Sequence, residues 1–235
     1  DPCSWTGVTC EGDRVTAVTL PGNMLTGTLP AELGLASYLT RLDLSGNRLQ
    51  GAVPAELGNL RSLAVLNLSE NQFAGTIPPR LRLLRSLRIL DLHENALNGP
   101  LPASLQDLTA LEYLNLADNR FTGTVPPELG SLTRLVTLRL DGNDLHGPLP
   151  ETLTALTALV TLAFDRTDLL EPPDPEFQAW LDGIANCRRT RVLYAEPVAP
   201  ANAGLAALAG MGTLGAALAA AWFVLLPLLG PLAGG

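Results

Sequence analysis

The sequence contains no lysine, and histidine, cysteine and aromatic residues are scarce. All 15 basic residues are arginine, against 23 acidic residues, so the formal net charge is −8. A chain this acidic lacks the basic stripe that nucleic-acid-binding proteins need. Two histidines and three cysteines leave little material for a metal site, and no phosphate-binding glycine loop or nucleophile motif is present. These absences argue against an enzyme and predict neither a cofactor nor a bound metal.

What the sequence does contain is one segment written seven times, with a period of 24 residues. The copy that begins at Leu39 reads LTRLDLSGNRLQGAVPAELGNL, and the same skeleton returns throughout residues 15–170. A fixed period over so many copies predicts a solenoid, in which each copy forms one coil and buries its apolar side against its neighbours.

Each recurring residue of the repeat has a predicted structural role. The leucines of L-x-x-L-x-L alternate with variable residues, as expected for a short strand with one buried face. The asparagine that follows would turn into the core and hydrogen-bond backbone groups of its own coil and of the adjacent coil. Glycine permits a positive φ, proline ends strand pairing, and the remainder favours a short helical or 3₁₀ return on the convex side. The predicted asparagine ladder comprises Asn23, Asn47, Asn71, Asn95, Asn119 and Asn143.

The full pattern, L-x-x-L-x-L-x-x-N-x-L-x-G-x-[LIV]-P-x-x-L, resembles the plant-type subclass of leucine-rich repeats. Its G-x-[LIV]-P half separates this subclass from the others, and the resemblance covers roughly Val15 to Leu169. It implies an α/β solenoid: a right-handed superhelix of about seven coils, with a parallel β-sheet on its concave side and a cap at each end. Fold and function are separate questions, so the pattern does not identify a ligand.

Residues 1–14 resemble the amino-terminal cap of the same family, C-x-W-x-G-V-x-C. The resemblance implies a disulfide between Cys3 and Cys10, with Trp5 as an apolar plug over the end of the first coil. A disulfide implies an oxidising compartment, and therefore export. Cys187 has no visible partner in the sequence and is expected to be free.

The repeat degrades after residue 164, and residues 171–196 are interpreted as a carboxy-terminal cap helix and linker. Aromatic residues replace leucines there, which suits the closure of an open solenoid end. An amphipathic pattern over residues 175–186 predicts a helix that starts at a proline. Its inward-facing residues would be Phe177, Trp180, Leu181 and Ile184.

Residues 197–235 form an apolar tail without a charged residue. Within it, residues 203–226 would extend about 36 Å as a helix, enough to cross a bilayer. Arginines precede this segment and no basic residue follows it, opposite to the positive-inside rule for an exported solenoid. The conflict disappears if the natural chain continues with basic residues, or if the tail is an anchor signal with its small residues at 201–203. We expect membrane attachment; an artefactual or disordered apolar tail is the alternative.

Two columns of variable strand residues define the predicted binding surface. In the central coils, an apolar stripe runs beside a stripe of acidic and amide side chains. Such a surface can hold an extended basic peptide, because apolar anchors supply binding energy and an acidic rim supplies orientation. The alternative is that these are ordinary solvated positions. The candidate ligand-binding residues are Arg41, Asp43, Val65, Asn67, Ile89, Asp91, His93, Tyr113, Asn115 and Arg139.

Three other features have a second interpretation. His93 beside two acidic residues could in principle hold a metal, although a variable surface histidine is the simpler interpretation. A convex arginine cluster is better explained by solubility and pairing with nearby acids than by a binding patch; it comprises Arg80, Arg82, Arg85 and Arg88. The sequence Asn67-Leu68-Ser69 is the only N-glycosylation sequon, and a glycan on it would obstruct the concave surface.

The sequence therefore predicts a non-enzymatic, exported recognition module that is held at a membrane and binds a protein or peptide on its concave face. The resemblance implies the ectodomains of receptor-like proteins and receptor kinases. The alternative is a soluble or wall-associated inhibitor of a secreted enzyme, similar to polygalacturonase-inhibiting proteins; a purely structural surface protein comes third. The apolar tail distinguishes the first two, because an inhibitor needs no anchor.

Overall fold

The structure is a computed structural model that describes residues 2–190. The membrane span expected at residues 203–226 and the anchor signal expected at 201–203 lie outside the described residues. Within the described part of the chain, no helix is long and apolar enough to cross a bilayer.

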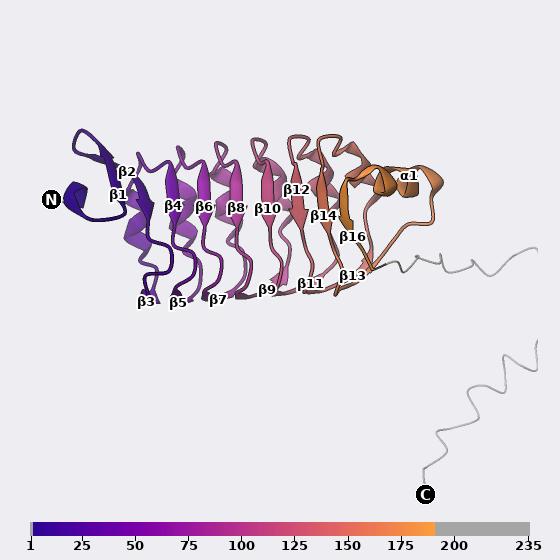
Figure 1. The fold of residues 1–235 in the computed structure, drawn as a ribbon, viewed down its shortest axis with the longest axis horizontal. Helices are drawn as coiled ribbons and strands as arrows, with labels where there is room; N and C mark the ends of the chain where they lie inside the picture. The colour runs from indigo at the N-terminus through magenta and orange to yellow at the C-terminus, as the bar shows by residue number, and fades with distance from the viewer. Residues whose placement is uncertain (1, 191–235) are drawn as a thin grey trace, which may run out of the picture. The chain divides into compact units, whose positions relative to one another are not determined.

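The repeats stack into a solenoid whose concave sheet takes one short strand from every coil (Figure 1). These strands are parallel and in register, so residues 24 apart in sequence pair directly: Leu66 lies between Leu42 and Leu90. The predicted fold is confirmed. The seven repeat strands are β2 (Arg14–Thr19), β4 (Arg41–Asp43), β6 (Val65–Asn67), β8 (Ile89–Asp91), β10 (Tyr113–Asn115), β12 (Thr137–Arg139) and β14 (Thr161–Ala163).

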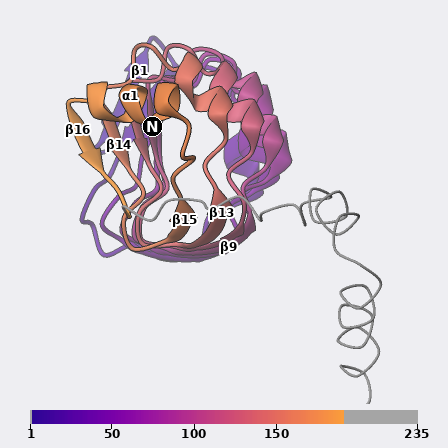
Figure 2. The same cartoon turned by 90° about the vertical axis from the view of Figure 1, so that its right-hand side faces the viewer.

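A second parallel sheet, which the sequence did not lead us to expect, follows the repeat asparagine of each coil, or Thr167 in the last coil (Figure 2). Leu49 is buried between exposed Arg48 and Gln50, so this segment also alternates as a strand with one buried face. A glycine with positive φ, such as Gly51 at 83°, bends the chain at the end of this segment. The strands are β3 (Thr26–Thr28), β5 (Arg48–Gly51), β7 (Gln72–Gly75), β9 (Ala96–Pro100), β11 (Arg120–Gly123), β13 (Asp144–Pro148) and β15 (Asp168–Leu170).

Short 3₁₀ helices complete the coils on the convex side, as predicted. Each starts after the repeat proline; Pro54, for example, has extended backbone and its carbonyl accepts from the N–H of Leu57 at 3.2 Å. Successive helices approach closely, because a Cβ at Gly58 would collide with the carbonyl of Arg80 in the next coil. The helices are η2 (Ala31–Leu35), η3 (Ala55–Asn59), η4 (Pro79–Leu83), η5 (Ala103–Asp107), η6 (Pro127–Ser131) and η7 (Glu151–Ala155).

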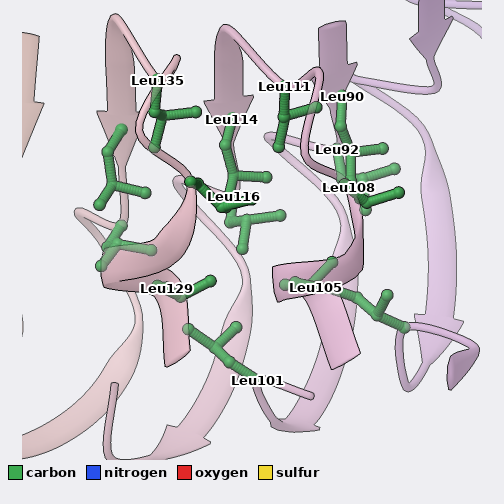
Figure 3. Close-up of a cluster of buried hydrophobic side chains, with 14 of the residues drawn as sticks. Leu90, Leu92, Leu101, Leu105, Leu108, Leu111, Leu114, Leu116, Leu129 and Leu135 are labelled. Atoms are coloured by element: carbon green, nitrogen blue, oxygen red, sulfur yellow. The ribbon is translucent and has the colours of Figure 1, made fainter. Parts of the chain in front are cut away.

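The core is a continuous stack of leucines in which every coil repeats the positions of the coil before it. Figure 3 shows strand leucines such as Leu90 and Leu114 and helix leucines such as Leu105 and Leu129 gathered in one cluster between the strands and the helices. All four are at most 1% exposed. Removing one such side chain typically costs about 2–5 kcal/mol, because the neighbouring coils cannot fill the space.

The repeat asparagines link each coil to its neighbours. Asn71 Oδ1 accepts from the N–H of Leu49 at 3.0 Å, and its Nδ2 donates to the carbonyls of Leu44 at 2.9 Å and Leu68 at 3.2 Å. Asn23 departs from the predicted ladder: it is exposed and its Nδ2 donates only to Pro21 of its own coil. The reason is local, because the strand on that side is the cap hairpin and not another repeat. Equivalent bridges to those of Asn71 are made by Asn47, Asn95, Asn119 and Asn143.

The amino-terminal cap consists of η1 (Pro2–Ser4) and β1 (Val8–Glu11), which pairs antiparallel with β2. A two-residue turn joins the two strands, and such a turn can connect only antiparallel neighbours. The Cys3–Cys10 disulfide is present, as predicted. The predicted plug is wrong: Trp5 is 65% exposed. The hairpin covers the edge of the sheet with backbone. A pocket of about 270 Å³ in the first coils is lined mainly by apolar residues such as Leu25, Leu29 and Leu33.

The carboxy-terminal cap contains α1 (Pro175–Gly183) and β16 (Asn186–Arg188). Asp174 caps the helix by accepting from the N–H groups of Glu176 and Phe177 at 2.9 and 2.8 Å. Three of the four residues expected to face inward are buried, and the fourth packs its ring 5.2 Å from Phe177; they are Phe177, Leu181, Ile184 and Trp180. The helix ends at Gly183 and not at Asn186, because Asn186 starts a strand that pairs with β14.

Candidate binding surface on the concave sheet

The concave surface is built from the outer residues of each three-residue strand. The middle residue is a buried leucine, so its two neighbours face away from the core. Register aligns Val65, Ile89 and Tyr113 in one column, next to Arg41 of β4. The second column aligns Asp43, Asn67, Asp91, Asn115 and Arg139. The structure therefore places these nine candidates on one face, and His93 follows two residues after Asp91.

The first column offers partly exposed apolar groups in three successive coils. Val65, Ile89 and Tyr113 are each half-buried, so part of each side chain remains open to a ligand. The Tyr113 hydroxyl accepts from Asn115 Nδ2 at 3.2 Å, which orients the ring. Burial raises the pKa of Tyr113, and the charge of Asp91 raises it further. The ring is therefore neutral and oriented at physiological pH.

The second column has a structural role that sequence reasoning missed. Asp43 Oδ1 accepts from the N–H of Ser45 at 3.2 Å and from its Oγ at 2.8 Å, which closes a turn at the end of the strand. Asp91 makes the same turn with His93, and Asn115 makes it with Ala117. An Asx residue two positions before the residue it binds is the sequence signal of such turns.

This role removes two candidates from the accessible surface. Asp91 is 8% exposed and Asn115 only 1% exposed, because each side chain folds over its own strand end. We had expected both to contact a ligand directly. They instead hold the backbone beneath the apolar column in place, while Asp43 and Asn67 remain half-buried.

His93 belongs to the same turn. Its Nδ1 lies 2.7 Å from Asp91 Oδ1, and its Nε2 lies 3.8 Å from Glu70 Oε1. Within residues 2–190, no group of three or more histidine, cysteine or acidic side chains is arranged to hold a metal ion. The imidazole is therefore part of the hydrogen-bonded turn that His93 forms with Asp91.

An acidic rim lies just beyond the strands, at a backbone position with unusual geometry. Glu70, Glu94 and Asp118 have φ values of 54°, 50° and 54°, whereas Gly46 and Gly142 occupy the same position in other coils at 65°. A side chain in this left-handed conformation costs roughly 1–2 kcal/mol. Glu70 and Glu94 are exposed, so the accessible negative charge of the middle coils is concentrated there. The glycines at equivalent positions were the sequence signal for this geometry.

The next coils carry an ion-paired cluster that bounds the surface. Arg139 binds Asp141 through two hydrogen bonds of 3.2 and 2.9 Å, and Arg166 bridges Asp141 and Asp118 at 3.1 and 2.8 Å. Burial works to raise the pKa of Asp141, but the hydrogen bonds and charge of Arg139, together with Arg166, outweigh it and lower the pKa. Arg139 is thus already engaged with protein groups.

Three further arginines near the sheet or on the convex side pair with acidic residues. Arg41 lies 3.9 Å from Asp43 at the amino-terminal edge of the surface. On the convex side, Arg82 pairs with Asp107 at 3.3 Å and Arg88 with Glu112 at 2.7 Å. For Arg82 and Arg88, two of the four arginines of the convex cluster, the contacts favour pairing with nearby acids over a binding patch.

The Leucine rich repeat family matches residues 37–97 and 85–145. A curated relative, the Probable inactive receptor kinase RLK902 of Arabidopsis thaliana, is 54% identical over 41 residues, which cover 17% of this chain and 6% of the relative.

Two solved structures extend the similarity over most of the chain. The leucine-rich-repeat ectodomain of the plant membrane receptor kinase GASSHO1/SCHENGEN3 from Arabidopsis thaliana, in complex with CASPARIAN STRIP INTEGRITY FACTOR 2, matches with a TM-score of 0.74 and 38% identity. The Arabidopsis receptor kinase HAESA, in complex with the peptide hormone IDA and the co-receptor SERK1, matches with a TM-score of 0.65 and 30% identity. Each match covers 80% of this chain, but only 23% and 36% of the respective relatives.

Proposed function

Because this chain belongs to the leucine-rich-repeat family and carries its plant-type repeat, we propose that it is a non-enzymatic module that binds a protein or peptide on its concave sheet. The observation that carries the proposal is the aligned column of Val65, Ile89 and Tyr113, half-buried in three adjacent strands. Adjacent strands lie about 4.8 Å apart, so the column is one continuous apolar strip across the coils.

The charge around the strip favours a basic ligand. Glu70 and Glu94 are exposed on one side of it, and Asp43 is partly exposed in the preceding coil. An extended peptide lying across the strands would direct apolar side chains to the strip and basic side chains to the rim. Charge of this kind steers association and fixes orientation more than it adds affinity.

The solved relatives support this class of ligand. HAESA is seen in complex with a peptide hormone and a co-receptor. GASSHO1/SCHENGEN3 is seen in complex with CASPARIAN STRIP INTEGRITY FACTOR 2. This chain spans 36% of HAESA and 23% of GASSHO1/SCHENGEN3.

Ligand capture tests the proposal. The full chain, immobilised, is incubated with a secreted peptide and protein fraction, and bound material is identified by mass spectrometry. A Tyr113→Ala variant serves as the matched bait, because it removes the largest group of the strip. We expect ligands that the wild type retains and the variant loses. Identical material on both baits would contradict binding at the concave sheet.

We also propose that the protein works at the cell surface or outside the cell, attached to a membrane through residues 203–226. The disulfide between Cys3 and Cys10 and the ectodomain relatives support export. The support for attachment is the uncharged sequence from residue 197 onward. Detergent phase partition of the full chain against a chain ending at residue 197 tests it. Equal partition into the aqueous phase would contradict attachment and favour a soluble inhibitor.

A further inference from the structure

The single Asn-x-Ser sequence of the chain, Asn67-Leu68-Ser69, lies in the middle of the concave sheet. Asn67 ends strand β6, directly between Asp43 of β4 and Asp91 of β8. Its Oδ1 accepts from the N–H of Ser69 at 3.1 Å and from its Oγ at 2.7 Å. Its Nδ2 makes no hydrogen bond to any other residue in the described range 2–190. The strand-end turn therefore uses only the oxygen of this amide.

The equivalent asparagine two coils later shows why this matters. Asn115 Oδ1 closes the same turn, but its Nδ2 donates to the Tyr113 hydroxyl at 3.2 Å and its side chain is 1% exposed. Val65 occupies the Tyr113 position beside Asn67, so no hydroxyl is available to bind the Asn67 nitrogen. Asn67 itself is half-buried. Only Asn67 combines the sequon with an Nδ2 that the fold does not use.

We propose that Asn67 is an N-glycosylation site, and that its glycan controls access to the concave surface; this second half rests on the proposed function. The sugar donor is a lipid-linked diphosphate oligosaccharide of the secretory pathway. A bond forms between Asn67 Nδ2 and C1 of the first sugar, and the bond from C1 to the diphosphate oxygen breaks. The diphosphate leaves with the bonding electrons, and Nδ2 releases one proton to solvent.

The turn survives this modification, because Oδ1 remains an acceptor for Ser69 and the glycosylated amide nitrogen stays outside the turn. The glycan, in contrast, would stand over the proposed binding strip. Val65 lies two residues earlier on the same face of β6, and Ile89 lies in the neighbouring strand about 4.8 Å away. A bulky polar group at Asn67 would exclude a peptide from these coils.

The site is tested by secreting the full chain from a eukaryotic host behind a cleavable signal and measuring its intact mass before and after peptide N-glycosidase. We expect one glycan, with conversion of Asn67 to aspartate on release. Ser69→Ala is the matched control, because Ala117 follows Asn115 at the same spacing in this chain. It removes the sequon without changing charge, and it should carry no glycan. A folded, secreted wild type without a glycan would overturn the site.

A reverse variant tests the geometric argument. Ala117→Ser creates a second sequon that begins at Asn115, where a glycan would have to displace a buried nitrogen from Tyr113. We expect the form of this variant that is glycosylated at Asn115 to be secreted at least severalfold less than the wild type. Equal secretion with full occupancy at Asn115 would show that an unused Nδ2 is not what makes Asn67 suitable.

Access is tested separately with a synthetic nonapeptide of alternating leucine and arginine. Enzymatic release leaves an extra carboxylate at residue 67, so Ser69→Ala supplies the neutral form. We expect the glycosylated protein to bind the peptide at least tenfold more weakly than the enzymatically deglycosylated protein and the Ser69→Ala variant do. Equal binding by all three forms overturns control of access. If no form binds the peptide, the result contradicts both the proposed function and control of access by the glycan. The mass measurement still tests whether Asn67 is glycosylated.

Discussion

Asn95 Oδ1 accepts a hydrogen bond from the backbone N–H of Phe73, which lies 22 residues earlier, at 2.9 Å. Its Nδ2 donates to the carbonyls of Leu68 at 3.0 Å and of Leu92 at 3.2 Å. One side chain thus pairs with backbone groups of two successive coils that would otherwise lack a hydrogen-bond partner.

Replacing Asn95 with alanine should lower the free energy of unfolding by about 2–3 kcal/mol, because a backbone donor and three carbonyl acceptors lose this partner. Thermal and urea denaturation measure the change. Asn23→Ala is the matched control: its side chain is exposed and bonds only within its own coil, so it should change stability by less than about 0.5 kcal/mol. Equal effects at the two positions would contradict the ladder.

The Cys3–Cys10 disulfide should be the only one among the described cysteines, with Cys187 free. Alkylation of the denatured, non-reduced protein should modify one cysteine, as counted by mass spectrometry. A Cys3→Ser, Cys10→Ser double variant should lose about 2 kcal/mol, the order expected for closing a short loop in the unfolded chain. Three alkylated cysteines would remove the structural argument for export.

The paired cluster around Asp141 should make stability fall in acid. The pKa of this carboxyl is lowered in the folded protein, so its contribution is present above its unfolded value of about 3.9 and is lost as the pH falls through the lower, folded value. Asp141→Asn should therefore reduce stability at pH 7 and flatten the loss below about pH 4. Urea denaturation at several pH values measures both. If the free energy of unfolding of Asp141→Asn falls in acid in parallel with that of the wild type, the acid-sensitive stability does not come from Asp141.

The residues of the acidic rim should lower the stability of the fold, because each has a left-handed backbone conformation. Glu94→Gly relieves a left-handed φ of 50° and should stabilise the protein by about 0.5–1 kcal/mol, once the greater flexibility of unfolded glycine is subtracted. The opposite change, Gly46→Ala, should destabilise it by about 1 kcal/mol. Glu94→Gly should also slow association with a basic peptide and reduce its salt dependence. Faster or unchanged association would exclude the rim from ligand steering.

The fold was readable from the sequence because its repeat is exact in period. Leucines such as Leu66 and Leu90 recur every 24 residues, and strands of equal phase can only align in register. The second sheet was missed because the segment around Leu49 contains one buried leucine and ends in glycine, a pattern that is typical of a turn. Trp5 was placed wrongly because an aromatic residue in a cap suggests burial, whereas the cap here is a backbone hairpin.

The candidate surface was only partly readable. Periodicity alone brings Val65, Ile89 and Tyr113 together, since they occupy one position of the repeat. It does not say whether Asp91 or Asn115 faces a ligand or closes a turn, because both roles require the same polar side chain. That distinction depends on the hydrogen bonds to His93 and Ala117, which the structure supplies.

The proposed binding strip is tested most directly by the affinity of a captured ligand for the Tyr113→Ala variant. The ring is the largest group of the strip and is only half-buried, so its loss should cost little stability. Tyr113→Phe is the control, because it keeps the ring and removes only the hydroxyl that accepts from Asn115. Titration calorimetry should give a Kd at least tenfold weaker for alanine, a loss of about 1.4 kcal/mol, and a nearly unchanged Kd for phenylalanine. An unchanged Kd for the alanine variant, with its melting temperature intact, would contradict recognition on the concave sheet.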